Sequence, residues 1–161
     1  MKTLTNQEER EANKFIEETI KVALNSTCER AKCGSIIVKD NEIIGQGFNS
    51  PANNSESQRR CNNNKDNYNK KITDKTCCVH AEQRAIMDAL KNNPSKLKDS
   101  RLYFIRLNEK NEKEPAGKPY CTICSKMALD AGIVEFILMH KEGIKVYKTD
   151  EYNNLSYNYQ E

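Results

Sequence analysis

The feature that most constrains this chain is a set of three side chains able to bind one metal ion. His80 is followed two positions later by Glu82, and Cys121 and Cys124 form a Cys-x-x-Cys pair that begins 41 positions after His80. Imidazole nitrogen and thiolate sulfur are ligands that zinc favours in tetrahedral geometry. The pattern therefore predicts a zinc ion held by His80, Cys121 and Cys124.

The number of ligands decides what such a site can do. A structural zinc site normally closes with four protein ligands, whereas a catalytic site keeps three and leaves the fourth position to water. Glu82 is placed to handle protons beside that water without binding the metal itself. Two alternatives stay open. One is a structural zinc completed by another cysteine, and the other is thiol redox chemistry, which gives no role to His80 or Glu82.

The order His-x-Glu followed by Cys-x-x-Cys matches the signature of zinc nucleobase deaminases, and the chain resembles the cytidine/deoxycytidylate deaminase family. The resemblance spans roughly residues 15–140 and is strongest at the two motifs. It is also carried by residues 26–51, which include the run Gly45-Gln46-Gly47-Phe48-Asn49, and by residues 125–133. One departure is Tyr120, which stands between Pro119 and Cys121 where the family generally has Pro directly before the first Cys.

The resemblance implies a role for each candidate site residue. It implies a zinc-dependent hydrolytic deaminase in which Glu82 is the catalytic acid and base. It also implies that Asn49 contacts the bound nucleotide and that the backbone N–H of Ala81 contacts the pyrimidine carbonyl. The alternative for Asn49 is a turn cap, a common use of Asn.

The resemblance further implies a three-layer α/β/α fold of the cytidine deaminase type, with a central mixed sheet of about five strands and helices on both faces. The hydrophobic pattern agrees, and a strand, a helix and a strand in succession predict a parallel crossover. The expected helices are residues 8–30, 79–92 and 121–131, and the expected strands are 35–38, 43–48, 102–107, 133–139 and 144–147.

Residues 50–75 are rich in Asn, Lys, Ser and Arg, which indicates a loop insertion within one domain covering residues 1–161. Arg59 and Arg60 suit a substrate phosphate, although exposed arginines are more often only solvated. By resemblance, a second and structural zinc is conceivable near the insertion, and small buried or free thiols are the simpler account. Its candidate ligands are Cys28, Cys33, Cys61, Cys77 and Cys78.

Composition limits the classes of partner that the chain is expected to bind. A net charge of +3 argues against a polynucleotide groove, so the expected partner is a small-molecule nucleotide, with deoxycytidylate first. The alternatives are another base, a nucleoside, a tRNA, or a non-catalytic zinc-stabilised binding module. No apolar run approaches the ~20 residues needed to span a bilayer, and seven cysteines do not indicate a disulfide framework. A cytoplasmic location is expected, and the resemblance implies a homo-oligomer.

Overall fold

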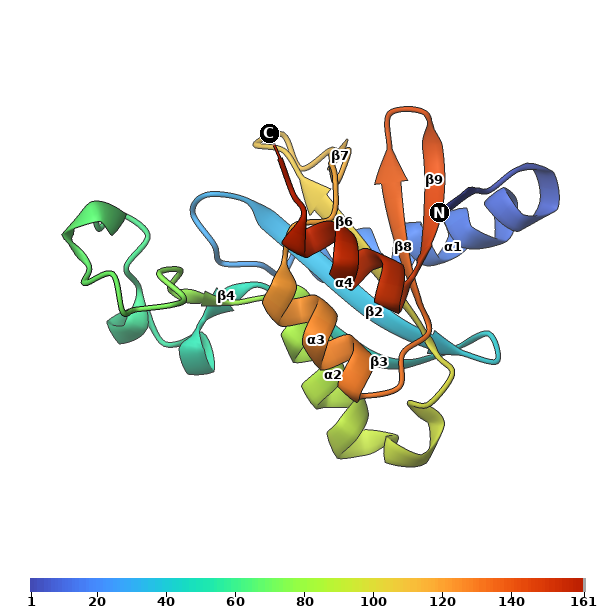
Figure 1. Cartoon of the computed structure of the whole chain (residues 1–161), viewed down its shortest axis with the longest axis horizontal. Helices are drawn as coiled ribbons and strands as arrows, with labels where there is room; N and C mark the ends of the chain where they lie inside the picture. The colour runs from blue at the N-terminus through green and yellow to red at the C-terminus, as the bar shows by residue number, and fades with distance from the viewer. Residues whose placement is uncertain (161) are drawn as a thin grey trace.

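A mixed β-sheet runs through the centre of the computed structural model, which describes residues 1–160 (Figure 1). The strand order is β1-β9-β8-β6-β2-β3, and β7 pairs with β6 outside this path. Strands β6 and β8 are parallel, as predicted, and the other pairs are antiparallel. The strands are β1 (Lys2–Thr3), β2 (Lys32–Lys39), β3 (Glu42–Phe48), β6 (Arg101–Leu107), β7 (Lys113–Glu114), β8 (Glu135–His140) and β9 (Gly143–Lys148).

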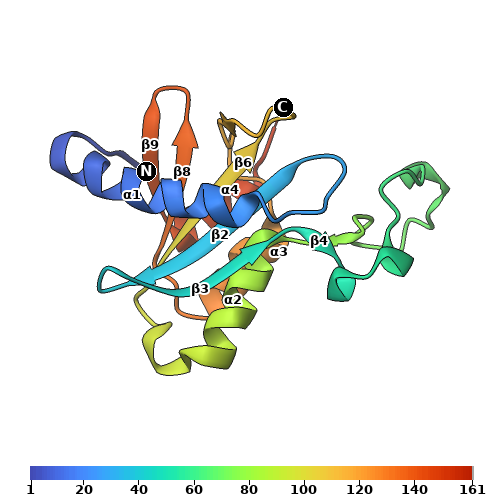
Figure 2. The same ribbon diagram turned by 180° about the vertical axis from the view of Figure 1, so that it is seen from behind.

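Helices cover both faces of the sheet, so the predicted three-layer architecture is confirmed. Figure 2 shows α1 (Asn6–Ala23) crossing one face, and Figure 1 shows the other three helices on the opposite face. Neighbouring residues of one strand belong to different cores, because successive side chains point to opposite faces. Leu102 packs in the core that includes α2 and α3, whereas Tyr103 packs with α1. The three helices are α2 (Ala81–Asn92), α3 (Thr122–Asp130) and α4 (Thr149–Tyr157).

One helix boundary and one additional helix differ from the sequence-based expectation. The first helix ends at Ala23 and not near residue 30, because the chain turns away to bring Ser26 Oγ within 2.6 Å of Asn49 Oδ1. The C-terminal tail, which was not among the expected helices, contains α4. Tyr152 of this helix stacks on Phe136 with ring centroids 4.1 Å apart, so burial of an aromatic face holds the tail on the core.

The N-terminal half of α2 lies directly on β3 because Gly47 has no side chain. A Cβ at Gly47 would lie 2.5 Å from the carbonyl oxygen of Ala81 and 2.5 Å from the backbone nitrogen of Ala85. A Cβ atom does not approach non-bonded backbone atoms this closely, so any larger residue would push the start of α2 off the sheet. The glycine therefore fixes the height of the helix that carries His80 and Glu82.

The segment expected as an insertion extends away from one end of the sheet (Figures 1 and 2). Its two ends are joined by a short ladder in which Ser50 pairs with Val79 and Pro51 pairs with Cys78. Within residues 1–160 no helix is long and apolar enough to cross a membrane. The short elements are β4 (Ser50–Pro51), β5 (Cys78–Val79) and the 3-10 turns Ala52–Asn54, Glu56–Gln58, Lys65–Asn67 and Pro94–Lys96.

Candidate metal centre and active site

The three predicted metal ligands all lie at helix starts. His80 is the residue before α2 and has extended backbone, and its N–H donates to Gln83 Oε1 at 2.9 Å. Cys121 is the residue before α3, and its Sγ accepts a hydrogen bond from the backbone N–H of Cys124 at 3.4 Å. The positive ends of two helix dipoles are therefore close to the same sulfur atoms, which favours thiolate character.

The structure brings these ligands together across 41 positions of chain. His80 Nδ1 lies 3.3 Å from Cys121 Sγ and 3.2 Å from Cys124 Sγ. One ligand atom from each residue lies within 4.8 Å of the others, and no other His, Cys, Asp or Glu of residues 1–160 joins this group. A tetrahedral zinc site separates nitrogen and sulfur ligands by about 3.6 Å. The donor set and its spacing therefore fit zinc, with one coordination position left over.

Charge at the site already favours a thiolate. Cys124 donates a hydrogen bond to Cys121, and with the nearby His80 this lowers the pKa of the Cys121 thiol to about 4. The hydrogen bond with Cys121 raises the pKa of His80 to about 9, although burial opposes the shift. The hydrogen bond that Cys124 donates to Cys121, together with burial, raises the pKa of Cys124 well above its ordinary value. A bound cation would take the place of the protons on His80 and Cys124.

Glu82 lies one residue into α2, and its side chain is almost completely buried, with a relative exposure of 6% for the residue. Burial raises the pKa of Glu82 to about 7, the negative charge of Cys121 adds to the rise, and His80 opposes it. A carboxyl group with a pKa near neutrality can both accept and return a proton at working pH.

A cavity of about 370 Å³ joins these groups. Its lining includes His80, Ala81, Glu82 and Cys121 on the helix side and Asn49 on the strand side. The predicted site residues therefore meet in one place, apart from Cys124, which lies behind Cys121 and is fully buried. A larger hollow of about 760 Å³ lies beside α1, and none of the predicted site residues lines it.

The side chain of Asn49 forms hydrogen bonds within the protein, whether or not it also contacts a ligand. Its Oδ1 accepts a hydrogen bond from the backbone N–H of Cys33 at 2.8 Å, and its Nδ2 donates to the carbonyl oxygen of Ala31 at 2.9 Å. Ser26 Oγ lies 2.6 Å from the same Oδ1. The side-chain oxygen is thus already used, and one Nδ2–H is left to meet a substrate.

A second group of sulfur atoms lies at the base of the insertion. The Sγ atoms of Cys28, Cys61 and Cys78 lie within 4.8 Å of one another. Cys77 Sγ adds a fourth sulfur, 3.4 Å from Cys61 and 3.9 Å from Cys78. Four thiolates around zinc are separated by about 3.8 Å. The sulfurs of Cys28, Cys61 and Cys78 therefore have a spacing that fits three zinc ligands, and Cys77 would have to move closer to Cys28 to complete a four-thiolate site. Cys33 lies outside the group.

We expect two zinc ions per chain in wild-type protein and one in the Cys61→Ser variant, which would still have the His80 site. If the lost ion contributes ~2 kcal/mol to folding, Tm falls by roughly 4–8 °C. Metal analysis and thermal unfolding measure both effects. Cys33→Ser is the matched control and should retain two ions. Equal zinc content in wild type and Cys61→Ser would show that the thiols hold no metal.

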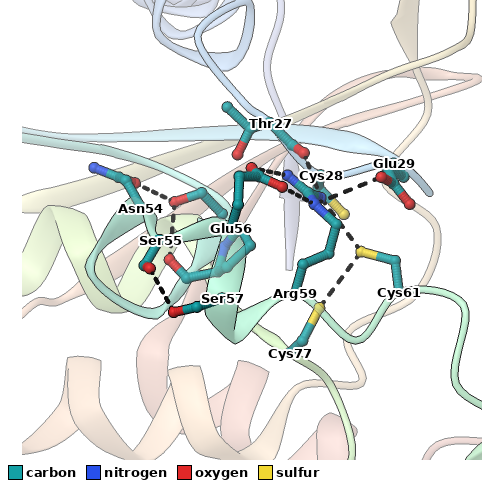
Figure 3. Close-up of polar contacts among 12 residues, drawn as sticks. Thr27, Cys28, Glu29, Asn54, Ser55, Glu56, Ser57, Arg59, Cys61 and Cys77 are labelled. Carbon is teal, nitrogen blue, oxygen red and sulfur yellow. Dashed lines mark hydrogen bonds and ion pairs between the residues drawn. The ribbon is translucent and has the colours of Figure 1, made fainter.

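Arg59 does not line the cavity. Its guanidinium contacts the insertion and the segment that follows α1 (Figure 3). Its guanidinium pairs with Glu56 at 2.6 Å, lies 3.5 Å from Glu29 and donates to the carbonyl oxygen of Thr27 at 2.8 Å. Of the arginine pair considered for a phosphate, only Arg60 lines the cavity. Lys65 and Lys75 also line it and were not singled out from the sequence, because lysine is common throughout the insertion.

The chain is similar to known proteins in sequence and in fold. Residues 9–140 match the family model described as the cytidine and deoxycytidylate deaminase zinc-binding region. The dCMP deaminase from the cyanophage S-TIM5, solved in complex with dCMP and dUMP, is 25% identical with a TM-score of 0.51, and the match covers 83% of this chain and 82% of that chain. The cytidine deaminase from Burkholderia pseudomallei is 16% identical with a TM-score of 0.56, covering 87% and 94%, and shows similarity of fold alone. No curated protein matches the chain.

Proposed function

Because this chain belongs to the cytidine and deoxycytidylate deaminase family of zinc-dependent hydrolytic deaminases, we propose that it converts a cytosine nucleotide, first of all dCMP, to the uracil nucleotide and ammonia. The observation that carries the proposal is the position of Glu82. Its buried carboxyl group lines the same cavity as His80 and Cys121. A binding module stabilised by zinc would have no use for an acid in that position.

His80 Nδ1, Cys121 Sγ and Cys124 Sγ are proposed to hold the zinc ion. When bound, zinc supplies Lewis-acid activation of the attacking water. The three side chains need little movement to do so, because their ligand atoms already lie within 4.8 Å of one another. The absence of a fourth ligand in this group among residues 1–160 favours a catalytic site over a closed structural one.

Glu82 is proposed to move the protons of the reaction. Its carboxylate accepts a proton from the water that attacks C4 of the cytosine ring and passes it to the adjacent ring nitrogen, N3. It then transfers the second proton of that water to the amino nitrogen, and the C4–N bond breaks to release ammonia. Cytosine and water thus become uracil and ammonia, and Glu82 ends in its starting protonation state.

The walls of the cavity are proposed to orient the base. The N–H of Ala81, at the first position of α2, has no acceptor within its own helix and can donate to the pyrimidine carbonyl. The remaining Nδ2–H of Asn49 can donate to the nucleotide. Phe104 lines the same cavity and offers apolar surface to the ring. These contacts would hold C4 toward Glu82 and exclude bulk water.

Two observations support a nucleotide as substrate. The cavity volume of about 370 Å³ lies within the range typical of small-molecule sites. The similar cyanophage protein was solved with dCMP and dUMP. By analogy with the family, we also propose that the chain acts as one domain, forms a homo-oligomer and works in the cytoplasm. Light scattering of the purified protein would test the oligomer.

An ammonia-release screen of the zinc-loaded protein tests the proposal. The screen should contain dCMP, CMP, deoxycytidine, cytosine, and amino-bearing purine bases and nucleosides. We expect the highest kcat/KM with dCMP. Release of ammonia only from a purine or from a free base would assign the chain a different substrate within the same family. No release from any compound at full zinc occupancy would leave the zinc-stabilised binding module as the better account.

A further inference from the structure

We propose that Tyr120 contacts the base of the bound nucleotide, and that Tyr159 of the C-terminal tail is a positioning residue that holds the Tyr120 ring at the opening of the cavity. The inference rests on the proposed function, because the base would lie in the cavity that contains Glu82. It gives a role to a position at which this chain departs from the family pattern, and it makes the tail part of the active site.

Tyr120 lies where the cavity opens to solvent. It directly precedes Cys121 in the chain and lines the cavity together with Glu82, yet the residue has a relative exposure of 57%. Its ring is therefore available to a ligand and is not needed to fill the hydrophobic core. A proline in this position, as in the family pattern, would offer no aromatic ring to the cavity.

Two elements of the fold each bring one phenyl or phenol ring to the cavity wall. Phe104 comes from β6 and packs against the core on the side of α2 and α3. Tyr120 comes from the segment that leads into α3. Aromatic side chains stack on the flat face of a nucleobase, and this contact tolerates any base because every base has such a face. A planar base in the cavity would therefore meet apolar surface from both elements.

The ring of Tyr120 is supported from the tail. The centroids of the Tyr120 and Tyr159 rings lie 5.9 Å apart at an interplanar angle of 57°, within the range of about 4.5–7 Å that aromatic pairs prefer. Tyr159 does not line the cavity, so any effect on a ligand must pass through Tyr120. Figures 1 and 2 show the segment after α4 running towards the loop that carries β7 and leads to α3.

The tail is fixed up to the residue before this contact. Ser125 Oγ of α3 donates to Asn153 Oδ1 of α4 at 2.8 Å. At the end of α4, the backbone N–H and the Nδ2 of Asn158 donate to the carbonyl oxygen of Asn154 at 3.2 and 2.8 Å. Tyr159 is the next residue. Because α4 is bonded to α3, and α3 follows directly on the segment with the first ring, one helix sets the position of both rings.

Calorimetry with dUMP and deoxyuridine tests the contact without turnover. In the zinc-loaded full chain, Tyr120→Ala is expected to weaken binding of both compounds by the same factor of about tenfold, as for a base that loses an aromatic neighbour. Tyr120→Phe should keep the wild-type affinity, because the ring is retained. With dCMP, Tyr120→Ala should raise KM by a similar factor and leave kcat nearly unchanged, because the contact is present in both the ground state and the transition state.

A double-mutant cycle tests the positioning role of Tyr159. Tyr159→Ala alone is expected to weaken dUMP binding by about threefold, within the contribution of an aromatic pair. In the Tyr120→Ala background it should have no further effect, because its influence passes through the missing ring. The matched control is Tyr157→Ala, which should leave the affinity unaltered. Tyr157 belongs to the same tail, has a relative exposure of 61% and does not line the cavity.

Zinc content and Tm show whether each variant is folded. Unchanged affinity in Tyr120→Ala, an equal loss in Tyr120→Phe, or unequal losses for dUMP and deoxyuridine would overturn the contact with the base. A further loss on adding Tyr159→Ala to Tyr120→Ala, or an equal loss in Tyr157→Ala, would overturn the positioning role. If no compound is deaminated, the proposed function fails and the titrations still decide the inference. Absence of dUMP binding to wild type would also overturn it.

Discussion

Replacing Glu82 with Gln is expected to lower kcat for dCMP deamination by about 10⁴-fold while zinc stays bound. The amide keeps the shape of the side chain but cannot accept a proton at neutral pH. Positioned proton transfer contributes roughly 10²–10⁴-fold, and Glu82 is asked to move two protons in sequence, so the upper end is expected. The measurement is kcat from initial rates at saturating dCMP, with zinc content determined on the same samples.

The control for this variant is Glu109→Gln, which makes the same chemical change at an exposed position and should leave kcat unaltered. Glu82 is buried and carries a raised pKa, so its neutral amide should be tolerated by the fold and Tm should not fall. A Glu82→Gln protein that retains a tenth or more of the wild-type kcat would remove Glu82 from the reaction.

Replacing Cys124 with Ala is expected to remove the zinc ion at the His80 site and to reduce deamination to less than about 10⁻⁴ of the wild-type rate, since the Lewis acid is lost. Cys124 Sγ lies 3.2 Å from His80 Nδ1 and is fully buried, so no other thiol can take its place without repacking. Zinc analysis and initial rates measure both effects. Chelation of wild type should also abolish the activity, and added zinc should restore it.

The second sulfur group provides a comparison variant for the Cys124→Ala experiment. Cys124→Ala and Cys61→Ser should each lose one zinc ion per chain, but only Cys124→Ala should lose the reaction at the base. If the two variants lose activity equally, the two metal sites do not have separate roles. If Cys124→Ala keeps its zinc, then His80, Cys121 and Cys124 are not the ligands.

Local spacing explains why the site itself could be predicted from the sequence. Cys121 and Cys124 lie three apart at the start of a helix, which places both sulfurs on one side of the first turn. His80 immediately precedes α2 and Glu82 is its second residue, so both lie at the start of a second helix. The strands were found because their apolar residues form short runs bounded by turns, as at Asp40 and Asn41, whose positive φ values close the β2–β3 hairpin.

Other features depend on contacts between distant parts of the chain. The sulfurs of Cys28 and Cys78 lie together although fifty positions separate them and no Cys-x-x-Cys spacing marks the group. Helical spacing continues past Ala23, but the hydrogen bond between Ser26 and Asn49 belongs to a loop that the periodicity cannot reveal. Lys65 and Lys75 resemble the other lysines of the insertion, and only their place on the cavity wall separates them.

The most direct test of the central claim is the stoichiometry of product formation by the zinc-loaded wild-type protein with dCMP. The account predicts that dUMP and ammonia appear in equal amounts, at a rate proportional to occupancy of the His80 site. The contradictory result is full occupancy of that site with neither product above the uncatalysed background.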